Sequence, residues 1–143
     1  MIIDTQLLDS LTSQAQASPR LRINLDLRTS AEDGSQRMLN AIETGSMVPV
    51  HRHQKSSETV VVLRGRAVEE YYDDAGNVTK SVLMTPVGDY LVADVPCNDL
   101  NVACALNIPA GQWHTIKALD SGTVILEMKD GAYEPIREED ILR

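Results

Sequence analysis

The N-terminal residues follow a helical pattern of hydrophobic positions. Three leucines recur at the spacing that places them on one face of an α-helix. Asp4 or Thr5 is suited to cap the start of this helix. Because the residue before a proline avoids the helical region, we expect the helix to end before Pro19. The leucines that set the pattern are Leu7, Leu8 and Leu11.

The pattern then changes to a strict alternation of polar and apolar residues from Arg20 to Arg28, which is typical of a strand with one buried face. Residues 30–35 (SAEDGS) are expected to form a turn. The charged side of this arm has two interpretations. It is either a cationic face for a phosphate or carboxylate group of a ligand, or a solvated edge strand whose charges prevent edge-to-edge pairing. Its polar residues are Arg20, Arg22, Asn24, Asp26 and Arg28.

From Gln36 onward, short β-like runs are separated by glycine and proline. The run Thr59–Leu63 (TVVVL) is rich in β-branched residues and suits a strand buried on both faces. Many short strands with regular turn signals indicate an all-β sandwich or barrel. The expected strands are Thr59–Leu63, Arg66–Asp73, Val78–Met84, Leu91–Val95, Val102–Ile108, His114–Ala118 and Thr123–Lys129.

A chain of 143 residues has the usual length of one domain, and we divide it into three parts. Residues 1–35 form the helix and the arginine-rich arm, residues 36–131 form the barrel, and residues 132–143 form a polar tail. The high charge of the tail predicts that it packs only loosely.

Composition excludes several classes of function. The formal net charge of −8 repels the phosphates of nucleic acid, and no basic stripe offsets it. No apolar run is long enough to span a bilayer, and the first residues do not resemble a signal peptide. We therefore expect a cytoplasmic protein with no membrane partner, in which Cys97 and Cys104 are reduced thiols.

The three histidines carry the candidate chemistry. His51 and His53 are two positions apart, so that on a strand both side chains project from the same face. Glu58 begins the TVVVL strand and is aimed inward, where a carboxylate needs an ion or a cationic group beside it. His114 comes from a distant segment. Three imidazoles and one carboxylate suit one divalent first-row metal such as Zn, Fe, Mn or Ni.

These residues also form a known signature. The pattern Gly45-(x)5-His51-x-His53-(x)4-Glu58-(x)6-Gly65 resembles the first motif of the cupin superfamily, and Pro109-x-Gly111-x-x-His114 resembles the second. The resemblance implies a jelly-roll barrel, the double-stranded β-helix, in which His51, His53, Glu58 and His114 bind one metal ion. The second motif departs from the pattern at Ala103 and Ala118, and neither is a ligand position.

Further segments resemble the WbuC-type cupin metalloproteins, which are associated with bacterial surface-polysaccharide gene clusters. The arm departs from this group at Arg28, where a histidine is expected. The matching segments are Pro19-Arg20-x-Arg22-x-Asn24, Gln36-Arg37-Met38-Leu39-Asn40-Ala41, His51-Arg52-His53, Ile108-Pro109-Ala110-Gly111-Gln112-Trp113-His114-Thr115 and Thr123-Val124-Ile125-Leu126-Glu127.

The resemblance also gives candidates for a ligand pocket near the metal. Of Tyr71 and Tyr72, which lie on opposite faces of one strand, at most one faces the barrel interior. Asn40 is a further candidate, and Trp113 is expected to pack in the core. The ligand-binding candidates are Arg22, Asn24, Arg37 and Tyr71.

Three functions remain open at this point. The first is a metalloenzyme acting on a small carbohydrate or sugar-nucleotide-type ligand, as an isomerase, epimerase or oxygenase. The second is a non-catalytic module that senses an anionic sugar, and the third is a barrel stapled by its metal. Because the metal takes every histidine, the proton-transfer group must be Glu58, a tyrosine, or a carboxylate such as Glu43 or Glu70. The edge strand at the arm allows a homodimer.

Overall fold

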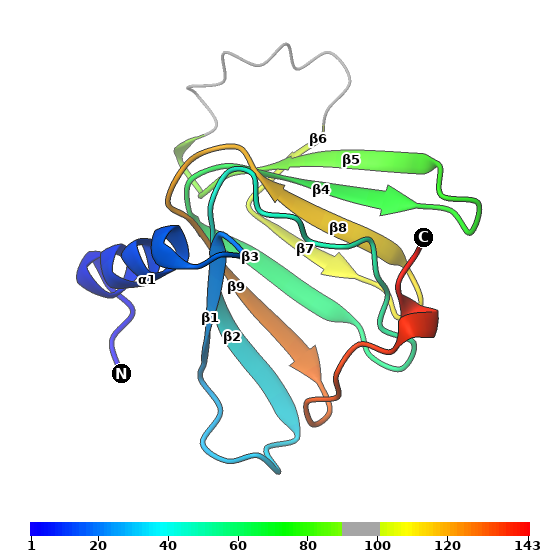
Figure 1. Ribbon diagram of the computed structural model, residues 1–143, viewed down its shortest axis with the longest axis horizontal. Coiled ribbons are helices and arrows are strands. Elements are labelled where there is room, and N and C mark those ends of the chain that lie inside the picture. The colour runs from blue at the N-terminus through cyan, green and yellow to red at the C-terminus, as the bar shows by residue number, and fades with distance from the viewer. Residues whose placement is uncertain (90–100) are drawn as a thin grey trace.

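The computed structural model describes residues 1–89 and 101–143 (Figure 1). Its only α-helix in those residues, α1 (Thr5–Ala17), begins where the leucine pattern predicts. The side chain of Asp4 accepts a hydrogen bond from the backbone N–H of Leu7 at 3.0 Å and caps the helix. The helix ends at Ser18, before Pro19, as expected. Among the described residues, no helix is long and apolar enough to cross a membrane.

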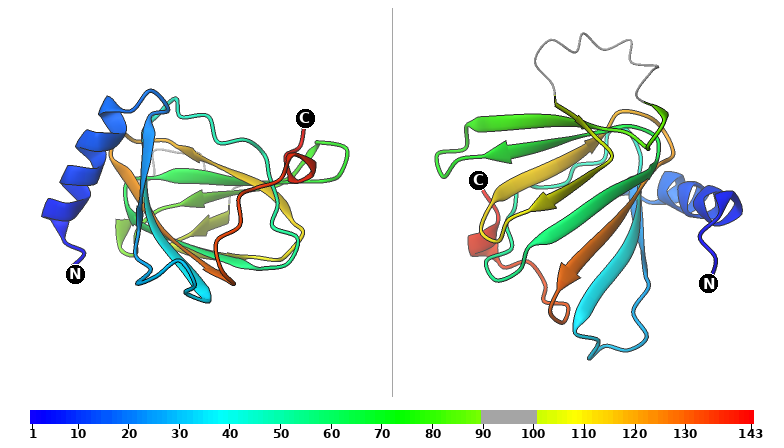
Figure 2. Two further views of the ribbon diagram at one scale, coloured as in Figure 1. Left: turned by 60° about the horizontal axis from the view of Figure 1, so that its bottom comes forward. Right: turned by 180° about the vertical axis from the view of Figure 1, so that it is seen from behind.

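Two facing sheets form the body of the protein (Figures 1 and 2). Neighbouring strands are antiparallel except for β5 and β6, which are parallel. A short 3₁₀ helix, η2 (Glu138–Asp140), follows near the C-terminus. In order across the sheets, the five-stranded sheet holds β1 (Arg22–Asp26), β2 (Ser35–Ile42), β9 (Thr123–Asp130), β3 (Glu58–Arg64) and β7 (Ala105–Ile108), and the four-stranded sheet holds β6 (Asn101–Ala103), β5 (Val78–Met84), β4 (Ala67–Tyr72) and β8 (Trp113–Ala118).

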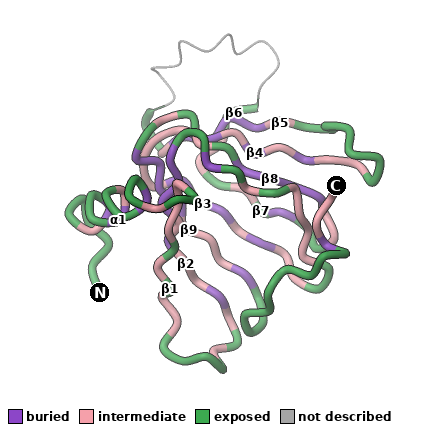
Figure 3. Tube along the Cα trace, in the orientation of Figure 1, coloured by how far each residue is buried: buried purple, intermediate pink, exposed green. Residues whose placement is uncertain are grey.

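Buried hydrophobic residues form two separate layers. Figure 3 marks the buried positions along the helix and the strands in purple. One layer fills the space between the two sheets and includes Val60, Ile116 and Ile125. The other lies between α1 and the outer face of the five-stranded sheet, where Leu8 and Leu11 pack near Leu39, Ala41 and Val124. Alternate residues of β2 and β9 therefore face opposite layers, which is the period of two that a strand imposes.

Two strand predictions need correction. The single strand expected over Val102–Ile108 divides at Cys104 into β6 and β7, which belong to different sheets. The chain crosses between the sheets there, with the carbonyl of Cys104 bonded to the N–H of Val62 at 3.0 Å. The outward residues of Thr59–Leu63 are only half-buried, so this strand has one fully buried face. The strand expected over Leu91–Val95, and Cys97, lie outside the described residues.

Gly65 ends β3 at a close approach to the neighbouring strand. Its φ of +74° lies in the left-handed region, and a Cβ built on it would lie 2.9 Å from the Cα of Thr123. A side chain at this position would force the backbone of β9 to move. The glycine that completes the first motif therefore has a structural role at this position.

The C-terminal tail is exposed over residues 131–139 and is attached to the barrel near its end, at Asp140 and Leu142. The carboxylate of Asp140 is buried and accepts hydrogen bonds from Arg52 Nε at 3.1 Å and from Gln54 Nε2 at 3.0 Å. The backbone N–H of Leu142 donates to the carbonyl of Val50 at 2.9 Å. These bonds attach the tail to the segment that carries His51 and His53, so its charge is used in specific contacts and is not all solvated.

Candidate metal centre

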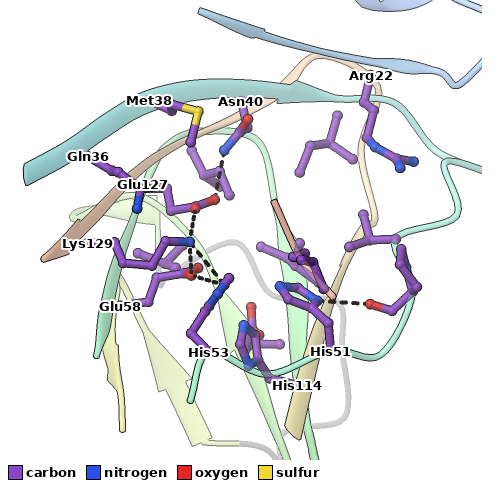
Figure 4. Close-up of a pocket in the computed structure, with 18 of the residues that line it drawn as sticks. Arg22, Gln36, Met38, Asn40, His51, His53, Glu58, His114, Glu127 and Lys129 are labelled. Atoms are coloured by element: carbon purple, nitrogen blue, oxygen red, sulfur yellow. Dashed lines mark hydrogen bonds and ion pairs between the residues drawn. The ribbon is translucent and has the colours of Figure 1, made fainter. Parts of the chain in front are cut away.

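Three histidines from two distant segments meet at one end of the space between the sheets (Figure 4). Each offers a ring nitrogen, and these nitrogens all lie within 4.8 Å of one another. His114 belongs to β8, whereas His51 and His53 lie in the loop between β2 and β3 and not on a full strand as expected. A single antiparallel bridge joins the segments, with His51 N–H to His114 O at 2.9 Å and His114 N–H to His51 O at 2.8 Å.

Hydrogen bonds to the backbone determine which nitrogen of two of these rings is available. Nδ1 of His51 lies 3.0 Å from the carbonyl of Pro49, and Nδ1 of His114 lies 2.9 Å from the carbonyl of Gln112. Because a carbonyl can only accept, each Nδ1 carries the hydrogen and each Nε2 keeps a free lone pair. Nε2 of His114 is buried and has no hydrogen-bond partner in the part of the chain that the structure describes. An ion is the natural partner for such a nitrogen.

The electrostatics of the site also favour neutral imidazoles. Burial, assisted by the nearby His114, lowers the pKa of His51 to about 4. Burial likewise lowers the pKa of His114, although the Glu58 carboxylate opposes this shift. Both rings are therefore uncharged near pH 7, which is the state that binds a divalent metal.

Glu58 lies beside the histidines but is engaged by other groups. Its Oε2 atom is 3.0 Å from Nε2 of His53 and 3.1 Å from Nζ of Lys129. Burial would raise the pKa of Glu58, but the hydrogen bond to His53 and the charge of Lys129 lower it to about 2. Two ligand atoms that each lie about 2.1 Å from the same ion, at an angle of about 90° at the ion, are about 3 Å apart. The distance between His53 Nε2 and Glu58 Oε2 therefore allows both atoms to bind one metal ion. The ligand atoms that all lie within 4.8 Å of one another belong to the three histidines. The carboxylate of Glu58 is not part of this set.

Lys129 is the residue of the site that the sequence reasoning missed. It is the cross-strand partner of Glu58 in the β3–β9 pair and is buried. Its ammonium group lies 3.0 Å from His53 Nε2, 3.1 Å from Glu58 Oε2 and 3.0 Å from Glu127 Oε1. Burial lowers the pKa of Lys129, but the carboxylates of Glu58 and Glu127 outweigh it and raise the pKa, so the side chain is charged. The only signal in the sequence was its alternation with Ile125 and Glu127 along the strand.

The histidine cluster opens into a cavity of about 260 Å³ between the sheets. Apolar side chains of both sheets line part of it, and its polar groups lie on β1, β2, β3, β4, β8 and β9, on the loop before β3 and on the tail. Asn40 donates to Glu127 Oε2 at 2.9 Å and so continues the polar wall away from Lys129. The lining residues include Met38, Asn40, Ile42, Val60, Ile116 and Ile125, together with Tyr133, Glu134 and Ile136 from the tail.

Of the four ligand-binding candidates, only Arg22 lines this cavity. Its Nη1 atom donates to the carbonyl of Met47 at 2.8 Å. Arg37 points away, because alternation along β2 aims its neighbours Gln36 and Met38 inward, and it forms an ion pair with Asp33 at 2.6 Å.

The remaining two candidates are also outside the cavity lining. Asn24 is exposed on the edge strand β1, and its side-chain amide lies 3.5 Å from the sulfur of Met38 on β2. Tyr71 faces the barrel interior as one of the two tyrosines was expected to, but it is packed within the core between the sheets. Tyr72 faces outward and donates to Glu70 Oε2 at 2.6 Å. The cavity is therefore lined by fewer of the ligand-binding candidates than the sequence suggested.

The carboxylates proposed for proton transfer also lie elsewhere. Glu43 accepts hydrogen bonds from Ser121 Oγ at 2.6 Å and from the N–H of Gly122 at 2.8 Å, which is a structural role. Glu70 is on the outer face of β4 and pairs with Lys117 at 2.7 Å. Its neighbour Glu69, one residue earlier, is the acid that lines the cavity. Of these two adjacent glutamates, the sequence analysis named Glu70, whereas the structure places Glu69 at the cavity.

Trp113 anchors β8 next to the last histidine, in the core position that was expected. It is buried, and its Nε1 donates to Asp74 Oδ1 at 2.9 Å. The guanidinium group of Arg52 lies 4.1 Å from the centre of its ring. This contact joins β8 to the loop between His51 and His53, which helps to hold the three imidazoles together.

Solved structures with the same architecture belong to the cupin fold. KdgF from Halomonas sp. matches with a TM-score of 0.56 and 11% identity, over 81% of this chain and 84% of that chain. The protein TT1209 from Thermus thermophilus matches with a TM-score of 0.57 and 18% identity, over 91% of this chain and 96% of that chain. Oxalate decarboxylase from Bacillus subtilis, described with Mn(II) centres, matches with a TM-score of 0.52 and 17% identity, over 85% of this chain but only 27% of its own. At these identities the likeness shows the fold, and the predicted jelly roll is confirmed.

No match to a curated protein was found. A family model described as a domain of unknown function, DUF6016, matches residues 3–84, from the start of the helix to the end of β5. This match includes His51, His53 and Glu58 of the first motif. Because the matched residues make up more than half of the chain, the protein belongs to the DUF6016 family and adopts the cupin fold.

Proposed function

We propose that this protein binds one divalent transition metal through His51, His53 and His114, with Glu58 as the fourth ligand. The observation that carries the proposal is the buried Nε2 of His114, which has no partner among the described residues and faces the other two imidazoles. Zn, Fe, Mn and Ni all suit this donor set. Glu58 reaches such an ion only in competition with Lys129, which already holds its carboxylate.

We further propose that the metal serves a reaction on a small carbohydrate or sugar-nucleotide-type ligand, which the resemblance to cupins associated with bacterial surface-polysaccharide gene clusters favours. A bound divalent ion supplies Lewis acidity, which polarises a carbonyl or hydroxyl group of a ligand. The residues of the chain then orient that ligand. Apolar side chains would contact the carbon atoms of that ligand, and Asn40, Glu127 and Arg22 offer polar contacts along the cavity.

The size of the cavity supports a small ligand. A volume of about 260 Å³ is below the ~300–1,000 Å³ typical of sites for drug-sized molecules. One sugar unit or a similarly small group suits this space, and a larger substituent would extend past the tail residues at the rim.

Metal titration tests the first part of the proposal. We expect the metal-free protein to bind one equivalent of Zn²⁺ or Co²⁺ in calorimetry, and His114→Ala to weaken this affinity by more than about 100-fold, because loss of a group that only supports a ligand already costs ~10–100-fold. Glu70→Ala is the matched control, since Glu70 lies outside the barrel. Binding that survives both His51→Ala and His114→Ala would contradict the proposal.

A screen of sugars and sugar nucleotides tests the second part. Metal-loaded protein should be stabilised against heat by its ligand, because a ligand that binds only the folded state raises its stability. Chromatography of the same mixtures then detects turnover. Stabilisation without any product would identify a binding module and refute the enzymatic reading.

A further inference from the structure

Glu69 is a buried acid that has no hydrogen-bond partner among the described residues. It lies in the middle of β4, has 1% of its surface exposed, and faces the cavity. Within residues 1–89 and 101–143, no group donates a hydrogen bond to either of its carboxyl oxygens, and Oε1 is cut off from solvent. A buried polar group without a hydrogen bond costs about 1–3 kcal/mol. A ligand that forms a hydrogen bond with Glu69 would remove this cost.

The charged groups around the cavity explain the protonation state of this acid. Burial, followed by the nearby carboxylates of Glu58, Glu127 and Glu70, raises the pKa of Glu69 well above its ordinary value. Two cations line the same cavity and donate elsewhere: Lys129 to Glu58 and Glu127, and Arg22 to the hydroxyl of Ser46 and the carbonyl of Met47. The raised pKa favours the protonated form of Glu69, in which its carboxyl group is a hydrogen-bond donor.

The register of the sheet places Glu69 next to the histidine cluster. In the β4–β8 pair, Glu69 lies opposite Ile116, and Tyr71 lies opposite His114. Glu69 and His114 are thus diagonal neighbours on the inner face, at a spacing of about 7–8 Å between backbones. Glu70, the next residue, lies on the outer side of β4 and is paired with Lys117.

We propose that the carboxyl group of Glu69 donates a hydrogen bond to an oxygen of the ligand bound at the histidine cluster and exchanges its proton with that oxygen. The inference rests on the proposed metal site and adds the class of ligand. That ligand is a small molecule with one oxygen for the metal and an adjacent oxygen that accepts from Glu69, as in a hydroxy-carbonyl compound. The O–H bond of Glu69 breaks as one forms on the ligand, and the resulting carboxylate takes a proton back from the ligand, without an oxidant or reductant.

Acetohydroxamate, which carries two adjacent oxygens, is the probe for this contact. Its affinity for the Co²⁺-loaded protein is measured from the visible absorption of the cobalt. Glu69→Leu removes the donor and should weaken binding about 10-fold or more, whereas Glu69→Gln keeps an N–H donor and should stay within about 3-fold of the wild type. Glu70→Gln is the matched control and should bind as the wild type does.

The outcomes separate this inference from the metal site. Failure of the wild type to take up Co²⁺ refutes the proposed function. Uptake of Co²⁺ without binding of acetohydroxamate, or equal affinity in the wild type and Glu69→Leu, refutes only the role of Glu69. Circular dichroism of each variant confirms that it is folded before the titration is read.

Infrared spectroscopy of the metal-free protein tests the proton directly. At pH 7 the wild type and Glu70→Gln should show a C=O stretch of a protonated carboxylic acid that shifts in D₂O. Glu69→Gln should lose that band. If the spectra of the wild type and Glu69→Gln agree in this region, Glu69 carries no proton and cannot donate to the ligand, whatever the result with metal.

Discussion

Two buried glutamates face the same cavity from opposite sheets, and their pKa values are shifted in opposite directions. Glu58 on β3 is bonded to Lys129 and His53, and its pKa falls to about 2. Glu69 on β4 has no such partner in the described chain, and its pKa rises well above the ordinary value. Both are almost fully buried. Burial alone therefore does not decide the charge of these two acids, which differ in whether a cation lies within hydrogen-bonding distance. The pKa of Glu127 is raised although it also accepts from Lys129, because burial and the charge of Glu58 outweigh that contact.

The comparison assigns different tasks to the two sides of the cavity. The β3 and β9 side holds a permanent network of charges, with Lys129 at its centre and Asn40 at its end. The β4 side presents Glu69, whose raised pKa favours its neutral form and whose carboxyl group has no hydrogen-bond partner among the described residues. A ligand between the sheets would meet a charged wall on one side and a proton donor on the other. The predictions below test this contrast in order of decreasing effect.

The largest effect is expected from removing the cation. Lys129→Met leaves Glu58 and Glu127 buried without a counter-charge, and breaking a buried ion pair from one side costs about 3–5 kcal/mol in the free energy of unfolding. Urea denaturation of the metal-free protein measures this loss. Lys117→Met, which removes an exposed partner of Glu70, is the control and should cost less than about 1 kcal/mol. Equal losses for the two variants would mean that Lys129 is not the centre of a buried network.

A smaller effect is expected from pH, through the imidazoles between the two acids. The pKa of His51 is about 4 in the folded protein, below its unfolded value of 6.5, so the folded state binds fewer protons between these values. Stability is therefore fully present above pH 6.5 and is lost as pH falls towards 4. The difference of about 2.5 units corresponds to a loss of up to about 3 kcal/mol in the metal-free protein.

Urea denaturation of metal-free protein at several pH values measures this loss. His51→Gln should flatten the curve over the same range, because it removes the group whose protonation differs between the folded and unfolded states. An unchanged slope in this variant would assign the pH dependence to other groups.

A gain in stability is expected from Glu69→Leu, in contrast to the loss expected from Lys129→Met on the opposite side of the cavity. Removing an unsatisfied buried carboxyl group should raise the free energy of unfolding by about 1–3 kcal/mol at pH 7. Because the folded pKa of Glu69 is raised, its cost grows as pH rises above the unfolded value of 4.5, and the advantage of the variant should grow with it. Thermal melts at pH 5 and pH 8 measure the difference. A destabilised variant at both pH values would show that the carboxyl group has a structural partner.

The smallest effect is expected one residue further along the strand. Glu70→Gln removes the charge that pairs with Lys117, whose side chain is 56% exposed, and exposed pairs contribute less than about 1 kcal/mol. Denaturation and metal titration should both agree with the wild type within that margin. A change in metal affinity would show that the outer face of β4 is coupled to the site.

Local features of the sequence were sufficient for several elements. The spacing of Leu8 and Leu11 and the cap at Asp4 depend only on nearby residues, so the bounds of α1 could be predicted. The run Val78–Met84 is β5 as expected, because turn residues mark where it begins. Cupin motif spacing likewise predicted the jelly-roll fold, which the solved structures confirm. That the three histidines come together agrees with the same motif, although metal binding itself stays a prediction.

The pairing of distant strands decided the rest. Nothing near Glu58 in the sequence indicates that Lys129 lies opposite it, because that contact exists only when β3 and β9 adopt their register. The choice between Glu69 and Glu70 depends on which face of β4 meets the other sheet, and a shift by one residue reverses it. The sequence by itself therefore determined the fold and the three histidines that gather in it, but not the places of Lys129 and Glu69 beside them. The tertiary structure decided their charges, since a buried acid is ionised or neutral according to the partners that other strands bring to it.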